Sequence, residues 1–188
     1  SGNVLVGIKG EFLTPNKQAI LDAINKIRKE AADEGLVDKY VPIKWSTDLE
    51  KTAFVRATEV SVTLKPERLS TKEIWTAFPS SNSIRGEALD VNYEGFLKAI
   101  ENWHAEKANY AAKKKGGTSK EFTGYYEVLV NSKFTYVGLA AFKNAASSQQ
   151  VATISLALGD DASSEELAGG YGSAIQYTEV TASNLSTV

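Results

Sequence analysis

Few side chains in this 188-residue sequence are of the types that perform chemistry at neutral pH. Cysteine is absent, which excludes disulfides, thiolate metal sites and a cysteine nucleophile. His104 is the only histidine, and a serine–histidine–aspartate triad is implausible because one base must reach both the nucleophile and an orienting carboxylate. The segment KKGGTS at 114–119 lacks the residue order of a phosphate-binding loop. The acidic run at 160–166 lacks the spacing of an EF-hand.

Four stretches have the apolar spacing or the capping residues of helices. They are 14–36, 46–64, a short one around Ile74, and a long one at 92–117. For the first we expect Thr14 to be the N-cap and Gly35 to stop the helix. For the second, Thr47 and Glu50 have the spacing of a capping box.

Four other stretches are rich in β-branched and aromatic residues and predict strands. They are 3–8, 134–142, 151–159 and 174–180. We expect the last of these to pair with the first. Helices come early and most strands come late, which favours an α+β protein with helices packed on an antiparallel sheet. The length fits one domain over residues 1–188.

Five segments, in order, resemble motifs of the CAP superfamily, the SCP-like domains of cysteine-rich secretory, antigen 5 and pathogenesis-related proteins. They are ILDAINKIRKEA, IKWSTDLEKTAFVRATE, RGEALDVN, ENWHAEKANY and TGYYEVLVNSKFTYVGLAAF. Their amino-acid sequences are most similar to those of the cysteine-free CAP modules of large wall-anchored surface proteins of Gram-positive cocci. The resemblance implies a three-layer α–β–α sandwich with a central antiparallel sheet. It implies a core at about 14–159, followed by a C-terminal extension at 160–188 that we expect to end in an added strand.

Many CAP domains have a cleft lined by two histidines and two glutamates, and in some members this tetrad binds a divalent metal. The resemblance puts the glutamates at Glu87 and Glu106, and it puts the histidine positions on Pro66 and Tyr125. Both imidazoles are lost, so we predict neither a metal nor a cofactor. Three interpretations of the two glutamates stay open: structural remnants that accept hydrogen bonds from the backbone or Tyr125, a remodelled ligand cleft, or a catalytic acid/base pair. His104 is predicted to be a surface residue.

The resemblance favours a non-enzymatic module of an extracellular, wall-anchored protein that acts in adhesion or in contact with a host or cell-surface protein. Arg68 and Arg85 are candidates for partner contacts, with structural salt bridges as the equal alternative. A net charge of −2 argues against nucleic acid as a partner, and no apolar run is long enough to insert in a membrane. The alternatives are a hydrolase that uses Glu87 and Glu106, and a module that binds a lipid or another small apolar ligand.

Overall fold

The computed structural model describes residues 2–161 and 170–188, which form both helices and strands. The helices are α1 (Lys17–Asp33), α2 (Thr47–Thr63), α3 (Phe96–His104), α4 (Lys107–Lys114) and α5 (Gly124–Val130), with 3-10 turns η1 (Ile74–Thr76) and η2 (Ala182–Thr187). The strands are β1 (Val4–Phe12), β2 (Lys44–Trp45), β3 (Arg85–Asn92), β4 (Tyr136–Asn144), β5 (Ala152–Gly159) and β6 (Gly172–Val180).

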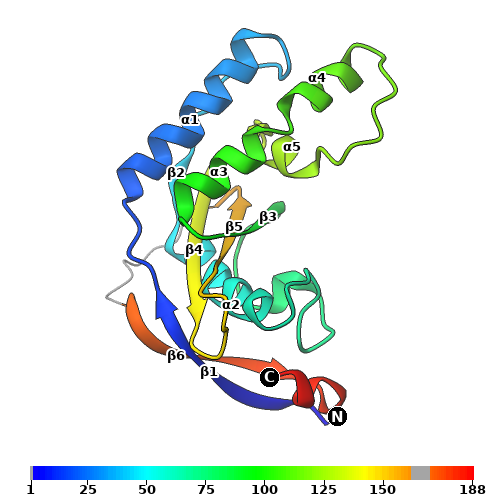
Figure 1. The fold of residues 1–188 in the computed structure, drawn as a ribbon. Coiled ribbons are helices and arrows are strands. Elements are labelled where there is room, and N and C mark those ends of the chain that lie inside the picture. The colour runs from blue at the N-terminus through cyan, green and yellow to red at the C-terminus, as the bar shows by residue number, and fades with distance from the viewer. Residues whose placement is uncertain (1, 162–169) are drawn as a thin grey trace.

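The central sheet has the strand order β3-β5-β4-β1-β6, and all of these neighbours are antiparallel. The short strand β2 is the exception, because it lies parallel to β4. Helices α1, α3 and α5 cover one face of the sheet and α2 covers the other, while α4 lies beyond the strands next to α5 (Figure 1). The three-layer α+β sandwich with a largely antiparallel sheet, expected from the sequence, is therefore confirmed.

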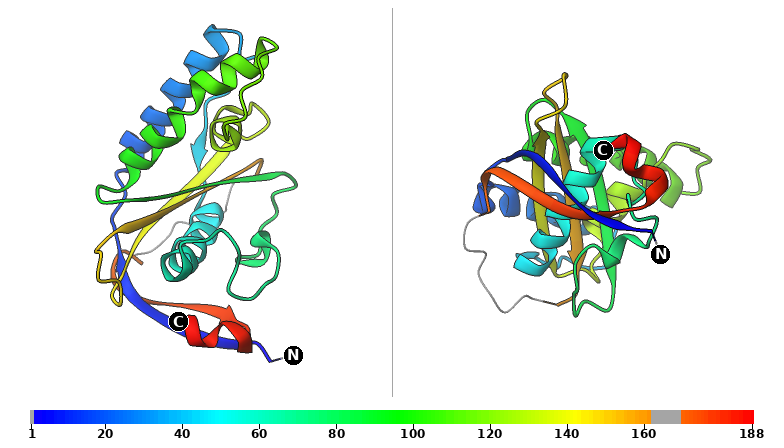
Figure 2. Two further views of the ribbon diagram at one scale, coloured as in Figure 1. Left: turned by 45° about the vertical axis from the view of Figure 1, so that its right-hand side comes forward. Right: turned by 90° about the horizontal axis from the view of Figure 1, so that it is seen from below.

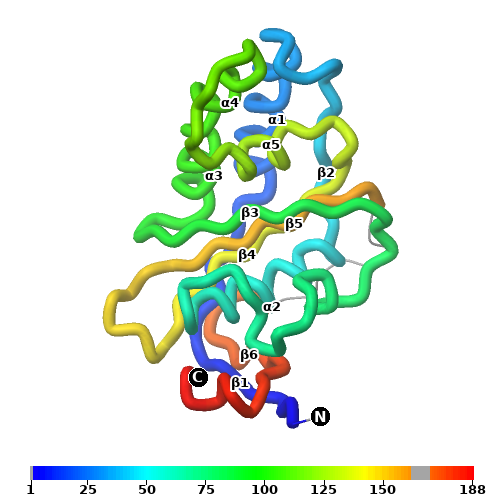
Figure 3. Tube along the Cα trace, turned by 90° about the vertical axis from the view of Figure 1, so that its right-hand side faces the viewer, coloured from blue at the N-terminus to red at the C-terminus, as the bar shows by residue number. Residues whose placement is uncertain are grey.

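Strands β1 and β6 form a long ribbon that leaves the plane of the sheet. β1 is paired with β4 only from Gly10 to Phe12, whereas its whole length is paired with β6. The ribbon crosses the outer side of α2, so that this helix lies between the ribbon and the sheet (Figures 2 and 3). Both chain ends lie at the same end of the ribbon (Figure 1). The expected pairing of the last strand with the first is thus present, but η2 rather than the strand ends the extension.

The sheet separates two hydrophobic cores, which follow the alternation of side chains along β4. Leu139 and Ala141 face the larger core, under α1, α3 and α5, where Trp103 is buried. Ala140 and Phe142 face the smaller core, which α2 and the ribbon complete. The inner face of α2 is apolar, as the helical spacing of its segment indicates, and four of its residues are buried: Leu49, Ala53, Ala57 and Val60.

Gly138 explains how closely α2 can approach the sheet. A Cβ added at this glycine in β4 would lie 2.1 Å from the backbone nitrogen of Glu50. No real Cβ approaches a backbone atom so closely, so the first turn of α2 rests directly on the β4 backbone. This contact fixes the height of α2, and therefore of its polar side chains, above the sheet.

The two predicted N-caps are each displaced by one or two residues. Asn16, not Thr14, caps α1, and its side chain accepts a hydrogen bond from the amide of Ala19 at 3.0 Å. Ser46 caps α2 in place of Thr47. Glu50 turns inward instead of closing a capping box, and it accepts hydrogen bonds from the Trp45 indole at 3.1 Å and from the Tyr171 hydroxyl at 2.5 Å.

The long helix predicted at 92–117 is wrong as one unit, because it divides into α3 and α4. At the break the amide of Glu106 bonds to the carbonyl of Trp103, three residues back, in a tightened turn. Regular bonding resumes when the amide of Tyr110 bonds to the carbonyl of Glu106. Among the described residues, no helix is long and apolar enough to span a membrane.

Candidate functional site

Glu87, one of the predicted site residues, forms an ion pair with Arg56 of α2. The Arg56 Nε donates to Glu87 Oε1 at 2.7 Å, and its Nη2 donates to Oε2 at 3.2 Å. The Arg56 side chain is fully buried and that of Glu87 is 11% exposed. Burial lowers the pKa of Arg56, but the hydrogen bonds and charges of Glu87 and Glu59 outweigh it and raise the pKa overall. The arginine therefore stays charged, and both carboxylate oxygens of Glu87 are occupied.

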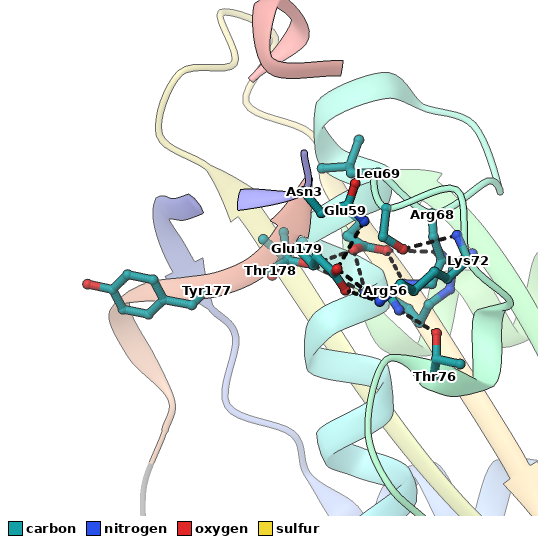
Figure 4. Close-up of polar contacts among 12 residues, drawn as sticks. Asn3, Arg56, Glu59, Arg68, Leu69, Lys72, Thr76, Tyr177, Thr178 and Glu179 are labelled. Carbon is teal, nitrogen blue, oxygen red and sulfur yellow. Dashed lines mark hydrogen bonds and ion pairs between the residues drawn. The ribbon is translucent and has the colours of Figure 1, made fainter. Parts of the chain in front are cut away.

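The pair belongs to a buried network of two arginines and two glutamates. Figure 4 shows three of them, Arg56, Glu59 and Arg68. Glu59, one turn after Arg56 on α2, accepts from Arg56 Nη1 at 3.2 Å. It also accepts from Arg68 Nε at 3.1 Å and Nη2 at 3.0 Å. The hydroxyl of Thr178 in β6 donates to Glu59 as well. The network balances its charges and connects α2, the loop before η1, β3 and the ribbon.

Pro66 lies beside this network through its backbone. Its carbonyl accepts a hydrogen bond from Nη2 of Arg56, the same nitrogen that donates to Glu87. Pro66 has no side-chain donor or acceptor, so it offers a metal or substrate no replacement for imidazole. One of the two histidine positions is thus connected to Glu87 through a single arginine.

Tyr125 and Glu106 complete the set of tetrad positions. The amide of Tyr126 donates to Glu106 Oε1 at 2.9 Å. Burial raises the pKa of Glu106, while backbone hydrogen bonds from Tyr126 and Tyr125 oppose the rise. Burial also raises the pKa of Tyr125, and the nearby charges of Glu87 and then Glu106 raise it further. Tyr125 therefore lies within the electrostatic reach of both glutamates, and the fold brings the four positions into one region.

The contacts of Glu87 and Glu106 fit a structural role better than they fit metal binding. Two carboxylates without imidazoles make a poor zinc site, and Arg56 supplies the positive charge beside Glu87. Within residues 2–161 and 170–188, no group of three or more histidine, aspartate or glutamate side chains could hold a metal ion. The end of the acidic run at 160–166 falls outside the described residues. Glu106 matches the interpretation that it accepts backbone hydrogen bonds, whereas the partner of Glu87 is an arginine that the interpretation did not include.

His104 lies apart from these residues, against α1. Its Nε2 is 2.9 Å from Glu30 Oε1, and its side chain is 36% exposed. Lys107 Nζ contacts the same Glu30 oxygen at 2.8 Å. The hydrogen bond from Lys107 and then that from His104 lower the pKa of Glu30. The sole histidine is therefore a partly exposed member of a surface ion-pair cluster.

The two arginines considered as partner contacts hold the scaffold together. Arg68 is 5% exposed, and besides Glu59 it donates to the hydroxyl of Thr76 at 2.7 Å. The guanidinium of Arg85 donates to the Asn82 carbonyl at 3.0 Å and lies over the Trp75 ring. Arg68 therefore forms the structural salt bridge of the alternative interpretation and has almost no surface to offer a partner. The contacts given for Arg85 are with backbone carbonyls and an aromatic ring instead.

Arg56 and Glu59 are the site residues that the sequence reasoning missed. They stand three residues apart on α2, in phase with the buried positions Ala53, Ala57 and Val60. Two opposite charges within an apolar face are a detectable signal, since a charged side chain that points inward must find a partner. The partners come from β3 and the loop before η1, which no local pattern on α2 reveals.

Comparisons with known proteins bear on the family and the fold. A model of the cysteine-rich secretory protein family, named CAP, matches residues 21–155. Venom allergen-like protein 4 of Schistosoma mansoni is 17% identical with a TM-score of 0.56, covering 84% of this chain and 97% of its own. That likeness supports the fold.

Two further solved structures superpose less closely. Hookworm platelet inhibitor is 16% identical with a TM-score of 0.49, covering 84% of this chain and 72% of its own. An outer surface protein of Borrelia burgdorferi is 12% identical with a TM-score of 0.46, covering 82% of this chain and 98% of its own. No curated protein sequence matches the chain. Because the family model matches most of the chain and the fold is that of a solved relative, this protein belongs to the CAP family of cysteine-rich secretory proteins, as a member that has no cysteine.

Proposed function

We propose that this chain is a non-enzymatic CAP module of an extracellular, wall-anchored protein of a Gram-positive bacterium. It acts in adhesion, through contact with a host or cell-surface protein, and not through metal chemistry. The observation that carries this proposal is the ion pair between Arg56 and Glu87, in which a guanidinium holds both oxygens of one tetrad glutamate.

The energetics of this pair argue against a metal in its place. For Glu87 to bind a cation, it would have to release Arg56, whose side chain is fully buried. Arg56 would keep Glu59 and the carbonyl of Pro66 but lose its other carboxylate, and breaking a buried ion pair costs up to about 3–5 kcal/mol. A metal would gain only two carboxylates in return, since Pro66 and Tyr125 offer no imidazole.

An exposed aromatic side chain next to the partly buried Tyr125 favours contact with a partner in the same region. Phe122 is 60% exposed, and its ring meets that of Tyr125 edge to face at 4.8 Å between centroids. Aromatic side chains that are exposed at a surface are frequent anchors in protein interfaces. Phe122 is the residue we expect a partner to cover.

Zinc titration by calorimetry tests the proposal. The unaltered chain is expected to show no stoichiometric binding, whereas a Pro66→His/Tyr125→His variant, which restores both imidazoles, should bind more tightly than the unaltered chain. Circular dichroism of both proteins checks that the fold is retained. Zinc bound one to one by the unaltered chain would contradict a module that works without metal.

A hydrolase is the second candidate, and one observation favours it. Burial raises the pKa of Glu106, and the charges of Glu106 and Glu87 both act on Tyr125. A carboxyl group with a raised pKa is what a general acid needs. A screen of peptide and glycan substrates should compare the chain with its Glu87→Gln/Glu106→Gln variant. Turnover that disappears in the variant would move the assignment to an enzyme.

A further inference from the structure

Strand β6 ends the sheet with an open edge. The strand order terminates at β6, and within the described residues its nine-residue length pairs with β1 alone. The opposite edge of the sheet is different, because the indole of Trp103 donates to the carbonyl of Leu89 in β3 at 2.9 Å. A side chain thus occupies one backbone group of the β3 edge. At the other edge the described residues place no strand beside β6, and a loop of the chain meets it only just after the strand, where the amide of Thr181 donates to the carbonyl of Leu69 at 3.0 Å.

The direction of the backbone groups in β6 follows from the pairing of β1. The carbonyl of Lys9 accepts from Ala145 and the amide of Leu13 donates to Ala141, so odd-numbered residues of β1 bond toward β4. Even-numbered residues of β1 therefore bond toward β6, since successive residues of a strand point to opposite sides. The register matches even residues with even ones, as in Ile8 with Gln176.

The odd-numbered residues of β6 consequently direct their N–H and C=O groups away from the sheet. They are Ser173, Ile175, Tyr177 and Glu179. One of these groups has a local substitute partner: the side chain of Gln176 donates to the carbonyl of Tyr177 at 3.1 Å. The edge is therefore a row of backbone donors and acceptors suited to another strand.

Apart from the loop contact at Thr181, this edge lacks the features that usually prevent strands from associating. Such edges commonly carry proline, lysine or a bulge, and the segment GSAIQYTEV has neither of the two residues. Its pairing with β1 runs in continuous register without a bulge. Its only charge, Glu179, is already held by Lys72 at 2.9 Å and by the side chain of Asn3.

The outer face of the ribbon adds an apolar surface beside the edge. Leu5 is 72% exposed, Tyr177 56% and Ile175 49%. Ile175 and Tyr177 lean over Gly7, where an added Cβ would meet them at 2.7 and 3.0 Å. Tyr177 points away from the buried ion network, on the other side of β6 from Thr178 (Figure 4).

We propose that two copies of this chain associate by antiparallel pairing of β6 with β6, about a two-fold axis at Gln176. Gln176 is the midpoint of the strand, so this register aligns its whole length. It also pairs odd residues with odd residues, whose backbone groups are the ones that point outward. A two-fold interface needs a surface that is complementary to itself.

The side chains of the edge meet that condition. Ile175 of one copy lies opposite Tyr177 of the other, a β-branched and aromatic pair of the kind that stabilises antiparallel sheets. Ser173 lies opposite Glu179 of the other copy, so a hydroxyl donor meets a carboxylate and no like charges face each other. A second copy is therefore an occupant whose edge and side chains both match β6.

A single engineered thiol tests this register. The chain has no cysteine, so Gln176→Cys introduces one thiol, which faces its own copy across the axis. Directly opposed residues of this non-hydrogen-bonded kind are about 4.5 Å apart between Cα atoms, which a disulfide can bridge. Mild oxidation should yield a covalent dimer much faster than for Lys133→Cys, an exposed site outside the ribbon. Equal rates for the two variants would overturn the proposed register.

Sedimentation at roughly 100 µM tests the interface itself, because at this concentration a dimer with a Kd of about 1 µM is almost completely associated. Ile175→Pro removes an outward N–H but no bond to β1, so it should give a folded monomer. Ile175→Val, which keeps the N–H and the branched side chain, should stay dimeric like the unaltered chain. Thermal unfolding of each variant verifies the fold. A monomeric unaltered chain, or an Ile175→Pro variant that is folded and equally dimeric, would overturn the proposal.

Discussion

Arg56 and Glu87 join α2 to the edge strand β3 through two hydrogen bonds, of 2.7 and 3.2 Å. Glu87 is one of the four tetrad positions that the family resemblance indicates. The guanidinium of Arg56 therefore accompanies a glutamate that other members can offer to a metal. Arg56 also contacts Glu59 and the carbonyl of Pro66. A single guanidinium therefore connects one retained acidic position with one lost histidine position.

Arg56→Met should lower the free energy of unfolding by about 3–5 kcal/mol, because it leaves Glu59 and Glu87 with one cation fewer in a buried environment. Denaturant unfolding at neutral pH measures the change. Lys29→Met is the matched control, since Lys29 pairs with Asp33 at the surface with side chains 60% and 61% exposed. That surface pair should contribute less than about 1 kcal/mol. Similar losses of free energy of unfolding for the two variants would show that the buried network contributes no more than a surface ion pair.

Arg28→Met should destabilise the chain by more than about 3 kcal/mol, because several buried carbonyls would lose their donor. The guanidinium donates to the carbonyls of Val41 at 2.8 Å, Leu129 at 2.9 Å and Phe134 at 2.7 Å, tying α1 to the end of α5. Burial lowers the pKa of Arg28 to about 10, so it stays charged at neutral pH. Denaturant unfolding at neutral pH measures the loss.

Arg28→Lys separates the charge from the geometry in the same experiment. Lysine keeps the cation but lacks the planar fork that reaches several carbonyls, so most of the loss should remain. The exposed neighbour Lys26 provides the control, and Lys26→Met should have little effect. Full stability in Arg28→Lys would mean that the charge alone matters.

The sequence predicted the fold well because the apolar patterns are local and regular. Ile24 in α1 and Ala53 in α2 lie on the buried faces that helical spacing indicates. The same patterns gave no indication of the buried arginines that connect the helices to the rest of the fold. Arg28 and Arg56 lie within those apolar faces, and their partners come from segments far along the chain.

Other errors arose where neighbouring residues compete for one role. Ser46 and Thr47 can both cap a helix, and the cap is the residue that keeps an extended backbone just before the first helical turn. In the structure this residue is Ser46, whose side chain accepts a hydrogen bond from the amide of Leu49. The tetrad positions could be assigned only through the family resemblance, because no local pattern brings Pro66 near Glu87. Their proximity depends on how α2 is seated on the sheet.

Gly138→Ala tests that seating. An added Cβ would lie 2.1 Å from the Glu50 nitrogen and 2.4 Å from the Leu49 carbonyl carbon. Both are backbone atoms that cannot rotate away, so α2 must shift, and we expect a loss of about 3 kcal/mol or more, beyond usual overpacking. Gly35→Ala is the control: no atom lies within 4 Å, but its φ of +73° should cost only about 1 kcal/mol. Calorimetric melting ranks the two, and a smaller effect at Gly138 would contradict the direct contact.

Glu106→Gln should stabilise the chain at neutral pH, by an amount that depends on pH. Burial raises the pKa of Glu106 above its unfolded value of about 4.3, so the folded state binds the proton more tightly. Stability from this group is therefore full below the unfolded pKa and is lost as the pH rises through the raised one. Glutamine keeps an oxygen for the amide of Tyr126 but has no charge to bury.

The advantage of the Glu106→Gln variant over the unaltered chain should accordingly be near zero at about pH 4, grow with pH, and level off above the raised pKa. Urea unfolding from roughly pH 4, near the unfolded pKa, upward through neutral pH measures it. Glu101→Gln is the control, because that side chain is 71% exposed. An advantage that shrinks with rising pH would mean that Glu106 is stabilised as an anion, as a metal ligand or the partner of a cation would be.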